Sequence, residues 1–336
     1  MDTLVLKPYQ FFEAGEIIRN GGIVAIPTET VYGLAAGAFF EAAIKNIYKA
    51  KGRPSDNPLI VHIADLNDVY KVVREFPDRA KFLAKRFWPG PLTMILPKNT
   101  EIPGIVTANS DSVAVRSPSH PIAQKIIKAA GVPVVAPSAN LSGKPSTTVF
   151  DHVVEDLMGK VDAIVDGGMC EIGVESTVVS LLSTTPKILR PGAITLENIS
   201  SVLGEAEIDK AVFEELTPGE KILSPGMKYK HYAPKARVIM VEGSSENYAA
   251  YVNSSDEKNK VALCLDEDIS LLKIPYISYG SKNDSKAQAH NLFDDLRKTD
   301  DMGAEVVYAH FCGHGGVSDA VYNRLIRASA FNVVKI

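Results

Sequence analysis

The stretch KGRPSDNPLIVH, residues 51–62, gathers side chains that could bind a polyanion beside a buried strand. Lys51 and Arg53 follow a helical pattern and lie on a Gly-Pro turn. Arginine offers a rigid fork of donors to phosphate oxygens, and lysine a mobile point charge. Asn57 precedes a proline, which favours extended backbone and lets its amide project into a crevice. The alternatives are a solvated basic turn and, for His62 at the end of an apolar run, a core histidine.

Two further stretches are rich in hydroxyl groups. PTETVYGLAAGA, residues 27–38, contains Thr30 and directly follows an expected strand, where α/β folds form their ligand crevice. VAPSANLSGKPS, residues 135–146, runs from a buried strand into a loop that could donate hydrogen bonds to phosphate. The polar residues of that loop are Ser138, Asn140, Ser142, Lys144 and Ser146. Neither stretch has Walker A or GxSxG spacing, so binding or a plain polar turn is favoured over covalent catalysis.

Other polar residues stand at the ends of expected strands. Arg116 lies in AVRSP, Ser176 and Thr177 in GVESTVV, and Arg190 in LRPGAI. An arginine at a strand end often forms a surface ion pair, which is the alternative to binding. No paired carboxylates, metal-ligand cluster or Ser-His-Asp pattern competes with these residues, so the sequence predicts a site that orients a polyanion without covalent attack.

The stretch HFCGHGG, residues 310–316, carries His310, Cys312 and His314. No second ligand cluster accompanies it, so we interpret it as a strand-to-loop turn, with metal binding as the alternative. We predict no metal site formed by protein ligands and assign this stretch no role.

The composition bounds the class of protein. The chain has 336 residues, 46% of them hydrophobic, and a formal net charge of −4, which argues against a protein that coats nucleic acid. Three well-separated cysteines, Cys170, Cys264 and Cys312, form no disulfide framework. The N-terminus lacks an apolar signal core, and no apolar run reaches the ~18 residues of a membrane span. We therefore expect a cytosolic protein without a membrane segment.

The hydrophobic pattern predicts two α/β units. In residues 1–204 the expected strands are 22–27, 59–63, 92–96, 113–116, 132–137, 163–166, 177–181 and 187–190. The expected helices are 9–20, 40–50, 66–75, 77–87 and 120–130. Some strands follow each other without a helix between them, which predicts a mixed sheet.

A change of pattern near residue 204 predicts a linker, residues 205–235, with turn signals but no sustained period. Residues 236–336 then form a smaller doubly wound unit. Its expected strands are 237–241, 261–265, 274–279 and 306–310, and its expected helices 244–253, 284–298 and 318–331.

Six spaced motifs resemble those of the Sua5/YciO/YrdC family: PTETVYGLA, KGRPSDNPLIVH, AVRSP, PSANLSGKPS, ESTVV and LRPGAI. The motif HYAP, residues 231–234, and the C-terminal unit resemble the two-domain Sua5 form. The resemblance covers nearly the whole chain. It implies a YrdC-like domain with a twisted mixed sheet (1–204), a linker that closes over the active site (205–235) and a Rossmann-like C-terminal domain (236–336).

The resemblance also implies an activity, that of an L-threonylcarbamoyladenylate synthase. Such a nucleotidyltransferase uses L-threonine, bicarbonate and ATP and releases pyrophosphate. The product then passes to a tRNA threonylcarbamoyl transferase that forms t6A at position 37. A Mg²⁺ ion bridging the ATP phosphates is expected from the chemistry, with substrate oxygens and water as its ligands.

Site residues are implied by matching positions. The expected catalytic tetrad is Lys51, Arg53, Ser138 and Asn140. The expected ATP-binding residues are Arg53, Asn57, Ser112, Ser138, Ser146, Arg190 and Tyr232. The expected threonine-binding residues are Thr30, His62, Arg116, Ala136, Ser176 and Thr177.

Two other functions stay open. The fold has been associated with double-stranded RNA binding, so weak RNA contact is one alternative, although the chain lacks a basic stripe. A carbamoyl-adenylate transferase, like the YrdC-like domain of hydrogenase-maturation proteins, is another, although its Cys-rich and acylphosphatase segments are absent here. YciO-type relatives are shorter, and the linker and second domain separate this chain from them.

Overall fold

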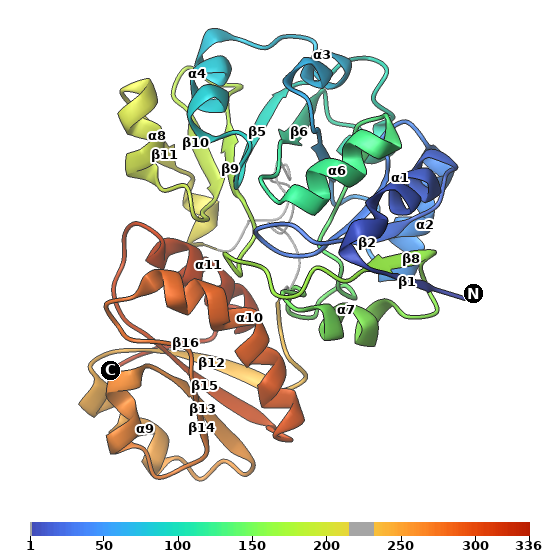
Figure 1. Ribbon diagram of the computed structural model, residues 1–336. Coiled ribbons are helices and arrows are strands. Elements are labelled where there is room, and N and C mark those ends of the chain that lie inside the picture. The colour runs from blue at the N-terminus through green and yellow to red at the C-terminus, as the bar shows by residue number, and fades with distance from the viewer. Residues whose placement is uncertain (1, 215–231) are drawn as a thin grey trace.

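The computed structural model describes residues 2–214 and 232–336, which form two α/β lobes, each around its own sheet (Figure 1). Most of the expected linker, residues 215–231, lies outside the described residues. Its first part is packed onto the first lobe, because β11 (Glu207–Ile208) pairs with β10 (Lys187–Arg190). None of the helices in the described part of the chain is long and apolar enough to cross a membrane.

The sheet of the first lobe is mixed, as the sequence predicts. Its strands, in sheet order, are β1 (Leu4–Leu6), β8 (Ala163–Val165), β2 (Val24–Ile26), β3 (Gly33–Gly37), β7 (Val134–Val135), β4 (Ile60–His62), β6 (Ser112–Arg116), β5 (Leu92–Pro97), β9 (Thr177–Ser180), β10 and β11. The pairs β2–β3, β3–β7, β4–β7, β5–β6 and β9–β10 are antiparallel, and the other neighbours are parallel. This order brings β4 and β6 together at the centre, so that His62 and Arg116 are register partners.

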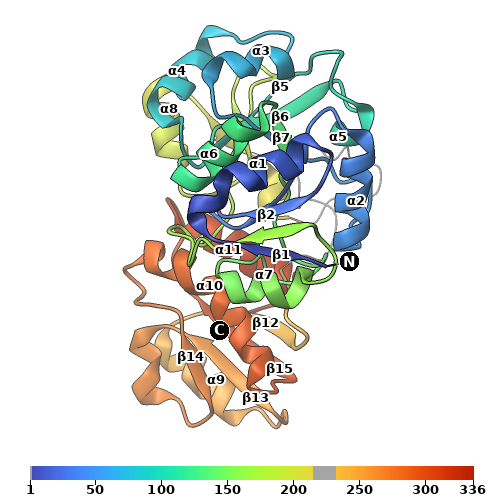
Figure 2. The same cartoon turned by 45° about the vertical axis from the view of Figure 1, so that its right-hand side comes forward.

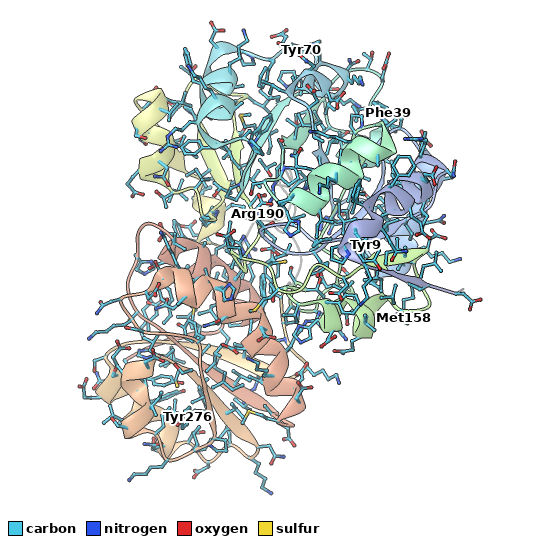
Figure 3. The ribbon with its side chains drawn as sticks, viewed as in Figure 1. Tyr9, Phe39, Tyr70, Met158, Arg190 and Tyr276 are labelled. Carbon is cyan, nitrogen blue, oxygen red and sulfur yellow. The ribbon has the colours of Figure 1, made fainter. Side chains whose placement is uncertain are left out.

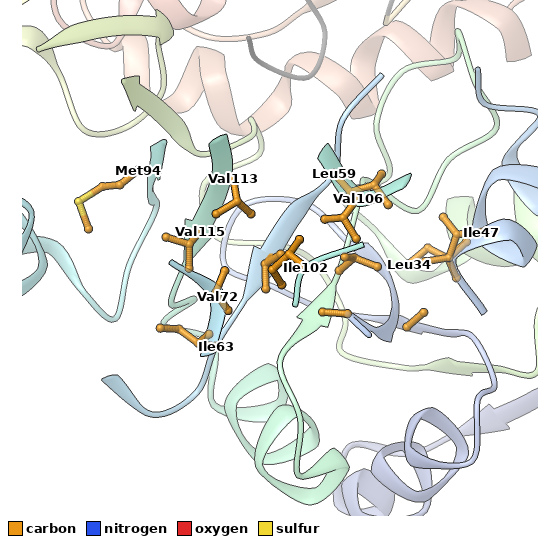
Figure 4. Packing of buried hydrophobic residues seen from close by; sticks show 14 of the residues in the cluster. Leu34, Ile47, Leu59, Ile63, Val72, Met94, Ile102, Val106, Val113 and Val115 are labelled. Carbon is orange, nitrogen blue, oxygen red and sulfur yellow. The ribbon is translucent and has the colours of Figure 1, made fainter. Parts of the chain in front are cut away.

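Helices cover both faces of this sheet. On one face, α1 (Phe11–Arg19) and α6 (Pro121–Ala130) pack together over a buried apolar cluster. The other face carries a larger cluster, part of which Figure 4 shows. Its helices are α2 (Glu41–Lys51), α3 (Val69–Val72), α4 (Asp78–Phe87), α5 (Gly104–Thr107), α7 (Phe150–Leu157) and α8 (Leu196–Leu203).

One central strand, β3, was not expected from the sequence. Its residues, GLAAG, include no β-branched side chain and are all buried. They form a strand because β2 and β7 flank them on both sides and satisfy their backbone groups. The small side chains also allow close approach, since a Cβ at Gly37 would lie 2.5 Å from the Phe40 ring. Tertiary packing overrides intrinsic β-propensity here.

The second lobe is a parallel sheet with helices on both faces, which confirms the doubly wound prediction. Its strands, in sheet order, are β14 (Tyr276–Ser278), β13 (Lys260–Cys264), β15 (Val306–Phe311), β12 (Arg237–Glu242) and β16 (Val333–Lys335). Its helices are α9 (Ser245–Ser254) on one face and α10 (Ser285–Asp301) and α11 (Ser318–Ala328) on the other. Helices α10 and α11 lie between this sheet and the first lobe in both views (Figures 1 and 2).

The stretch 310–316 gives no metal cluster within the described residues. The buried imidazole of His310 instead lies 2.6 Å from the carboxylate of Asp268 and stacks on Tyr248. Three glycines at positive φ then turn the chain toward α11. This agrees with the interpretation as a strand-to-loop turn.

Candidate active site

A pocket of about 750 Å³, including space open to solvent, lies on the sheet of the first lobe and faces the second lobe. Most of its polar wall comes from strand ends and loops that lie far apart in the sequence. Eleven of the fifteen candidate residues line it: Thr30, Lys51, Arg53, His62, Arg116, Ala136, Ser138, Asn140, Ser176, Arg190 and Tyr232. Figure 3 labels Arg190 near the junction of the two lobes.

Strand alternation decides which side chains face the pocket. In β4, Ile60 and His62 line the pocket while Val61 packs in the core on the opposite face. Because successive side chains point to opposite faces of a strand, the pairing of β4 with β6 places Arg116 beside His62. The apolar runs that predicted these strands therefore also determine which polar ends reach the site.

Arg116 is buried and held by two partners from the loop after β2. Its Nη1 donates to Thr30 Oγ1 at 2.9 Å, and its Nη2 lies 2.8 Å from Glu29 Oε1. Burial alone would raise the pKa of Glu29, but the charge and close contact of Arg116, together with nearby backbone N–H groups, outweigh burial and hold that pKa below its usual value. The Thr28 hydroxyl, 2.9 Å from that of Thr30, braces the loop by donating to Val31 O. This loop therefore fixes a guanidinium at the pocket wall.

His62 is a neutral imidazole. Its Nδ1 lies 3.1 Å from Ile60 O, and only 3% of the residue is exposed. Burial, with the charge of Arg116 beside it, lowers the pKa of His62 to about 3. The neutral ring donates from Nδ1 to the carbonyl, so its second nitrogen, Nε2, is a hydrogen-bond acceptor.

Lys51 ends α2, and its ammonium contacts the backbone of the 135–146 loop. Its Nζ donates to Ser138 O at 2.5 Å and to Asn140 O. In return, Ser142 N donates to Lys51 O at 2.9 Å. Burial, with the charge of Arg53 nearby, lowers the pKa of Lys51 well below its usual value. The structure thus assigns Lys51 a role in holding this loop against α2.

Arg53 is a half-buried cation tied to its own turn. Its Nη2 donates to Asn57 O at 3.3 Å and to Pro58 O at 3.1 Å. Burial lowers the pKa of Arg53 to about 10, so the guanidinium remains charged at neutral pH. Its Nη1 has no hydrogen-bond partner among the described residues and is available to a ligand.

Arg190 supplies a further cation, from the end of β10. Its Nε donates to Ser176 O at 3.1 Å and its Nη2 to Ser176 Oγ at 3.2 Å. The Ser176 hydroxyl also lies 2.8 Å from Thr93 Oγ1, so this serine is fixed from two sides. Together with Lys51, Arg53 and Arg116, this arginine makes the pocket strongly cationic.

One carboxylate, Glu175, also lines the pocket, and it is paired from the second lobe. Its Oε1 accepts from Ser146 Oγ at 2.5 Å, and its Oε2 from Nε of Arg324 on α11 at 2.9 Å. Burial alone would raise the pKa of Glu175, but the charges of Arg324 and Arg190 and the Ser146 hydroxyl outweigh it and lower that pKa. Glu175 is therefore an anion whose first counter-ion lies outside the first lobe.

Tyr232 closes the pocket on the side of the second lobe. Its ring centroid lies 5.1 Å from that of Phe293, and Arg324 Cζ lies 5.9 Å from the ring centroid. The neighbouring backbone is anchored, since Ala233 N donates to Gly143 O at 2.9 Å. Burial raises the pKa of Tyr232, so its phenol is neutral.

Four candidate residues do not line the pocket. Thr177 is the first residue of β9, directly after Ser176, and its hydroxyl donates away from the pocket to Ile194 O at 2.6 Å. Ser112 lies at the far end of β6 from Arg116 and lines a small neighbouring hollow. Asn57 and Ser146 are buried behind the wall, and Ser146 reaches the pocket only through Glu175.

Three residues of the site were not singled out from the sequence: Glu29, Glu175 and Arg324. Both carboxylates directly precede a predicted site residue, Thr30 and Ser176 respectively. A buried arginine needs a counter-ion, so a search for acids beside the predicted arginines would have indicated them. Arg324 could have been noticed as an arginine among the apolar residues of an expected helix, where a buried charge needs a partner.

The described residues contain no group of three or more metal-binding side chains that could hold an ion. The two carboxylates at the site are both engaged with arginines. The buried amide oxygen of Asn140, in contrast, has no hydrogen-bond partner and is free to meet a ligand. The cations that line the pocket fit an anionic substrate, and the amide oxygen of Asn140 can accept a hydrogen bond from it.

Comparisons with known proteins identify the family of both lobes. A Sua5/YciO/YrdC family model, described as "Telomere recombination", matches residues 16–192. A second model, described as "Threonylcarbamoyl-AMP synthase, C-terminal domain", matches residues 194–330. The two matches together span both lobes.

Individual relatives are similar over the whole chain. A threonylcarbamoyl-AMP synthase of Pyrococcus abyssi is 44% identical, with 96% of this chain and 95% of that protein covered. One from Bacillus subtilis is 43% identical, with 99% and 97% covered. The crystal structure of P. abyssi Sua5 complexed with L-threonine superposes with a TM-score of 0.90 at 42% identity and full coverage of both chains. The chain therefore belongs to the Sua5/YciO/YrdC family and has the two-domain architecture of Sua5.

Proposed function

We propose that this chain is a threonylcarbamoyl-AMP synthase, which converts L-threonine, bicarbonate and ATP into threonylcarbamoyl-AMP and pyrophosphate. The observation that carries the proposal is one pocket that gathers Lys51, Arg53, Arg116 and Arg190 around hydroxyls and backbone groups. Two relatives that match over nearly their full length bear this name, and the similar P. abyssi structure holds L-threonine.

Threonine would bind at the end of the pocket built by β4 and β6. Its carboxylate would meet the Arg116 guanidinium, whose Nη2 has no well-aligned hydrogen bond to Glu29 within the described residues. The Nε2 atom of neutral His62 can accept a hydrogen bond from the threonine hydroxyl. Such an acceptor would discriminate against valine, because a buried polar atom left unpaired is costly.

ATP would occupy the more open part of the pocket, beside Arg53, Arg190 and the 135–146 loop. Arg53 Nη1 and the amide oxygen of Asn140 have no hydrogen-bond partner among the described residues, and both residues line the pocket. Charge-assisted hydrogen bonds from guanidinium groups suit phosphate oxygens. Tyr232 offers a neutral aromatic face and a hydroxyl for the nucleotide.

The reaction needs orientation more than activation of a protein nucleophile. The threonine nitrogen attacks the carbon of bicarbonate, and loss of water leaves a carbamate. A carbamate oxygen then attacks the α-phosphorus of ATP, and the bond to the leaving pyrophosphate breaks. Cations fixed around the phosphates would stabilise the charge that develops there.

Mg²⁺ would enter with ATP as part of the substrate and be held by phosphate oxygens and water, since the carboxylates of Glu29 and Glu175 are both paired with arginines. The product is a mixed anhydride, so its consumer must transfer the threonylcarbamoyl group. We propose a tRNA threonylcarbamoyl transferase in that role, giving t6A at position 37.

The test is pyrophosphate release by the pure protein, with the product identified by mass spectrometry. We expect release only when threonine, bicarbonate and ATP are all present, and threonylcarbamoyl-AMP as the product. Replacing threonine with valine should abolish most of the signal. Pyrophosphate release without an amino acid, or release of phosphate alone, would overturn the proposed reaction.

A further inference from the structure

The second lobe places a fully buried arginine behind the wall of the pocket, in contact with the pocket residue Glu175. Arg324 lies on α11 and none of its surface is exposed. Its three nitrogens donate across the junction of the lobes: Nε to Glu175 Oε2 at 2.9 Å, Nη2 to Glu175 O at 3.2 Å, and Nη1 to Pro191 O at 2.5 Å. Glu175 directly precedes Ser176, and Pro191 directly follows Arg190. Arg324 therefore holds the backbone next to the two pocket residues Ser176 and Arg190.

Arg190 lies close to the same carboxylate, because it donates to the carbonyl and the hydroxyl oxygen of Ser176, the residue that directly follows Glu175. Arg324, which contacts Glu175 directly, is the first cation that stabilises this carboxylate, and Arg190 is the second. Without Arg324, the buried carboxylate of Glu175 would keep Arg190 as its main counter-ion. A buried anion strongly favours pairing with the nearest cation, because an unpaired buried charge is very costly. Arg190 would then be drawn from the pocket toward Glu175.

We propose that Arg324 is a positioning residue of the active site: by neutralising Glu175 it leaves Arg190 free to bind the phosphates of ATP. This inference rests on the proposed function, in which Arg190 is an ATP ligand. It gives the C-terminal domain an indirect part in catalysis, since Arg324 neutralises Glu175 only when α11 packs against the first lobe. Arg324 itself does not touch the reacting atoms.

Two single substitutions remove the same ion pair with opposite consequences for ATP. Arg324→Met leaves Glu175 to compete for Arg190 and should raise the KM for ATP on the order of tenfold, the loss expected for one charge-assisted contact. Glu175→Gln removes an anion from beside the phosphates and should lower the KM for ATP. Both variants should unfold at lower temperature than the wild type. If Arg324 and Glu175 had only a structural role, both substitutions would instead change the KM for ATP in the same direction.

The double variant, Arg324→Met with Glu175→Gln, is the decisive measurement. We expect its KM for ATP to return to within about threefold of the wild-type value, because no buried anion then remains to hold Arg190. Failure of Glu175→Gln to relieve the defect, or an unchanged KM in Arg324→Met, would overturn the inference. If Arg324→Met does not fold, Arg324→Lys and Glu175→Gln replace it as the test. Arg324→Lys retains the positive charge and should preserve the KM for ATP. A raised KM for ATP in Glu175→Gln would refute the charge argument.

Arg297→Met provides the matched control. Arg297 is also a buried arginine that crosses the junction, with Nη2 2.7 Å from Asp156 Oδ2. Its partner Asp156 does not line the pocket and keeps a second cation, Lys144 Nζ, at 2.7 Å. The control should lose thermal stability, and Glu175→Gln should not relieve any change in its KM for ATP.

Binding of α,β-methylene-ATP, measured by calorimetry for every variant, separates this inference from the proposed reaction. If the wild-type protein makes no threonylcarbamoyl-AMP, the proposed function fails, and the Kd values still test the coupling of Arg324 to Arg190. If the wild type is active and the Kd values are equal in all variants, only the inference fails.

Discussion

Replacing His62 with asparagine should remove the contribution of this histidine to the acid sensitivity of the first lobe. Asparagine retains an N–H that can donate to Ile60 O but does not titrate. The pKa of His62 is about 3 in the folded protein, against 6.5 for an ordinary histidine. The unfolded chain therefore takes up a proton at a higher pH than the folded chain does. Stability must fall as the pH decreases from about 6.5 toward 3, since acid favours the state that binds more protons.

The magnitude follows from linkage. At pH 5 nearly every unfolded molecule carries the His62 proton while the buried ring remains neutral, and this difference lowers the free energy of unfolding by about 2 kcal/mol relative to pH 7. Any folded pKa below about 4 gives nearly the same result, because the ring is then neutral at both pH values. His62→Asn should abolish this part of the loss.

The assay is urea unfolding at pH 7 and pH 5, followed by the fluorescence of Trp88. This is the only tryptophan in the chain, and it packs against the core of the first lobe, so its signal reports the lobe that contains His62. Val61→Ala, at the adjacent core position, is the control. It should lower the free energy of unfolding equally at both pH values, because it removes no titrating group. An equal loss between pH 7 and pH 5 in wild type and His62→Asn would refute the view of His62 as a buried neutral imidazole.

Two further predictions test the roles of the cations. Arg53→Ala should weaken ATP binding by about 10–150-fold with little effect on threonine, and Arg116→Ala should do the reverse, as measured by calorimetry with each ligand; normal binding of both ligands by both variants would contradict the site assignment. Lys51→Met should strand the carbonyls of Ser138 and Asn140 and lower the unfolding free energy by roughly 2–5 kcal/mol, while weakening both ligands together; a selective loss of ATP would instead indicate direct phosphate contact by Lys51.

The sequence alone determined much of this protein. Short apolar runs bounded by turn signals located most strands of both lobes and put His62 and Arg116 at strand ends. Local sequence carries this information because a buried strand needs a short run of apolar residues whatever its neighbours are. The motif resemblance then indicated the family and eleven of the residues that line the pocket.

Tertiary structure decided what each of those residues contacts. GLAAG became the central strand β3 only because β2 and β7 flank it, and Thr177 turned away from the pocket once the register of β9 was fixed. The ion pair between Glu175 and Arg324 joins residues 149 positions apart, and no local pattern encodes it. Periodicity specifies the face on which a charge lies, but its partner depends on how distant elements pack, so the link between the C-terminal domain and the pocket emerged only from the folded chain.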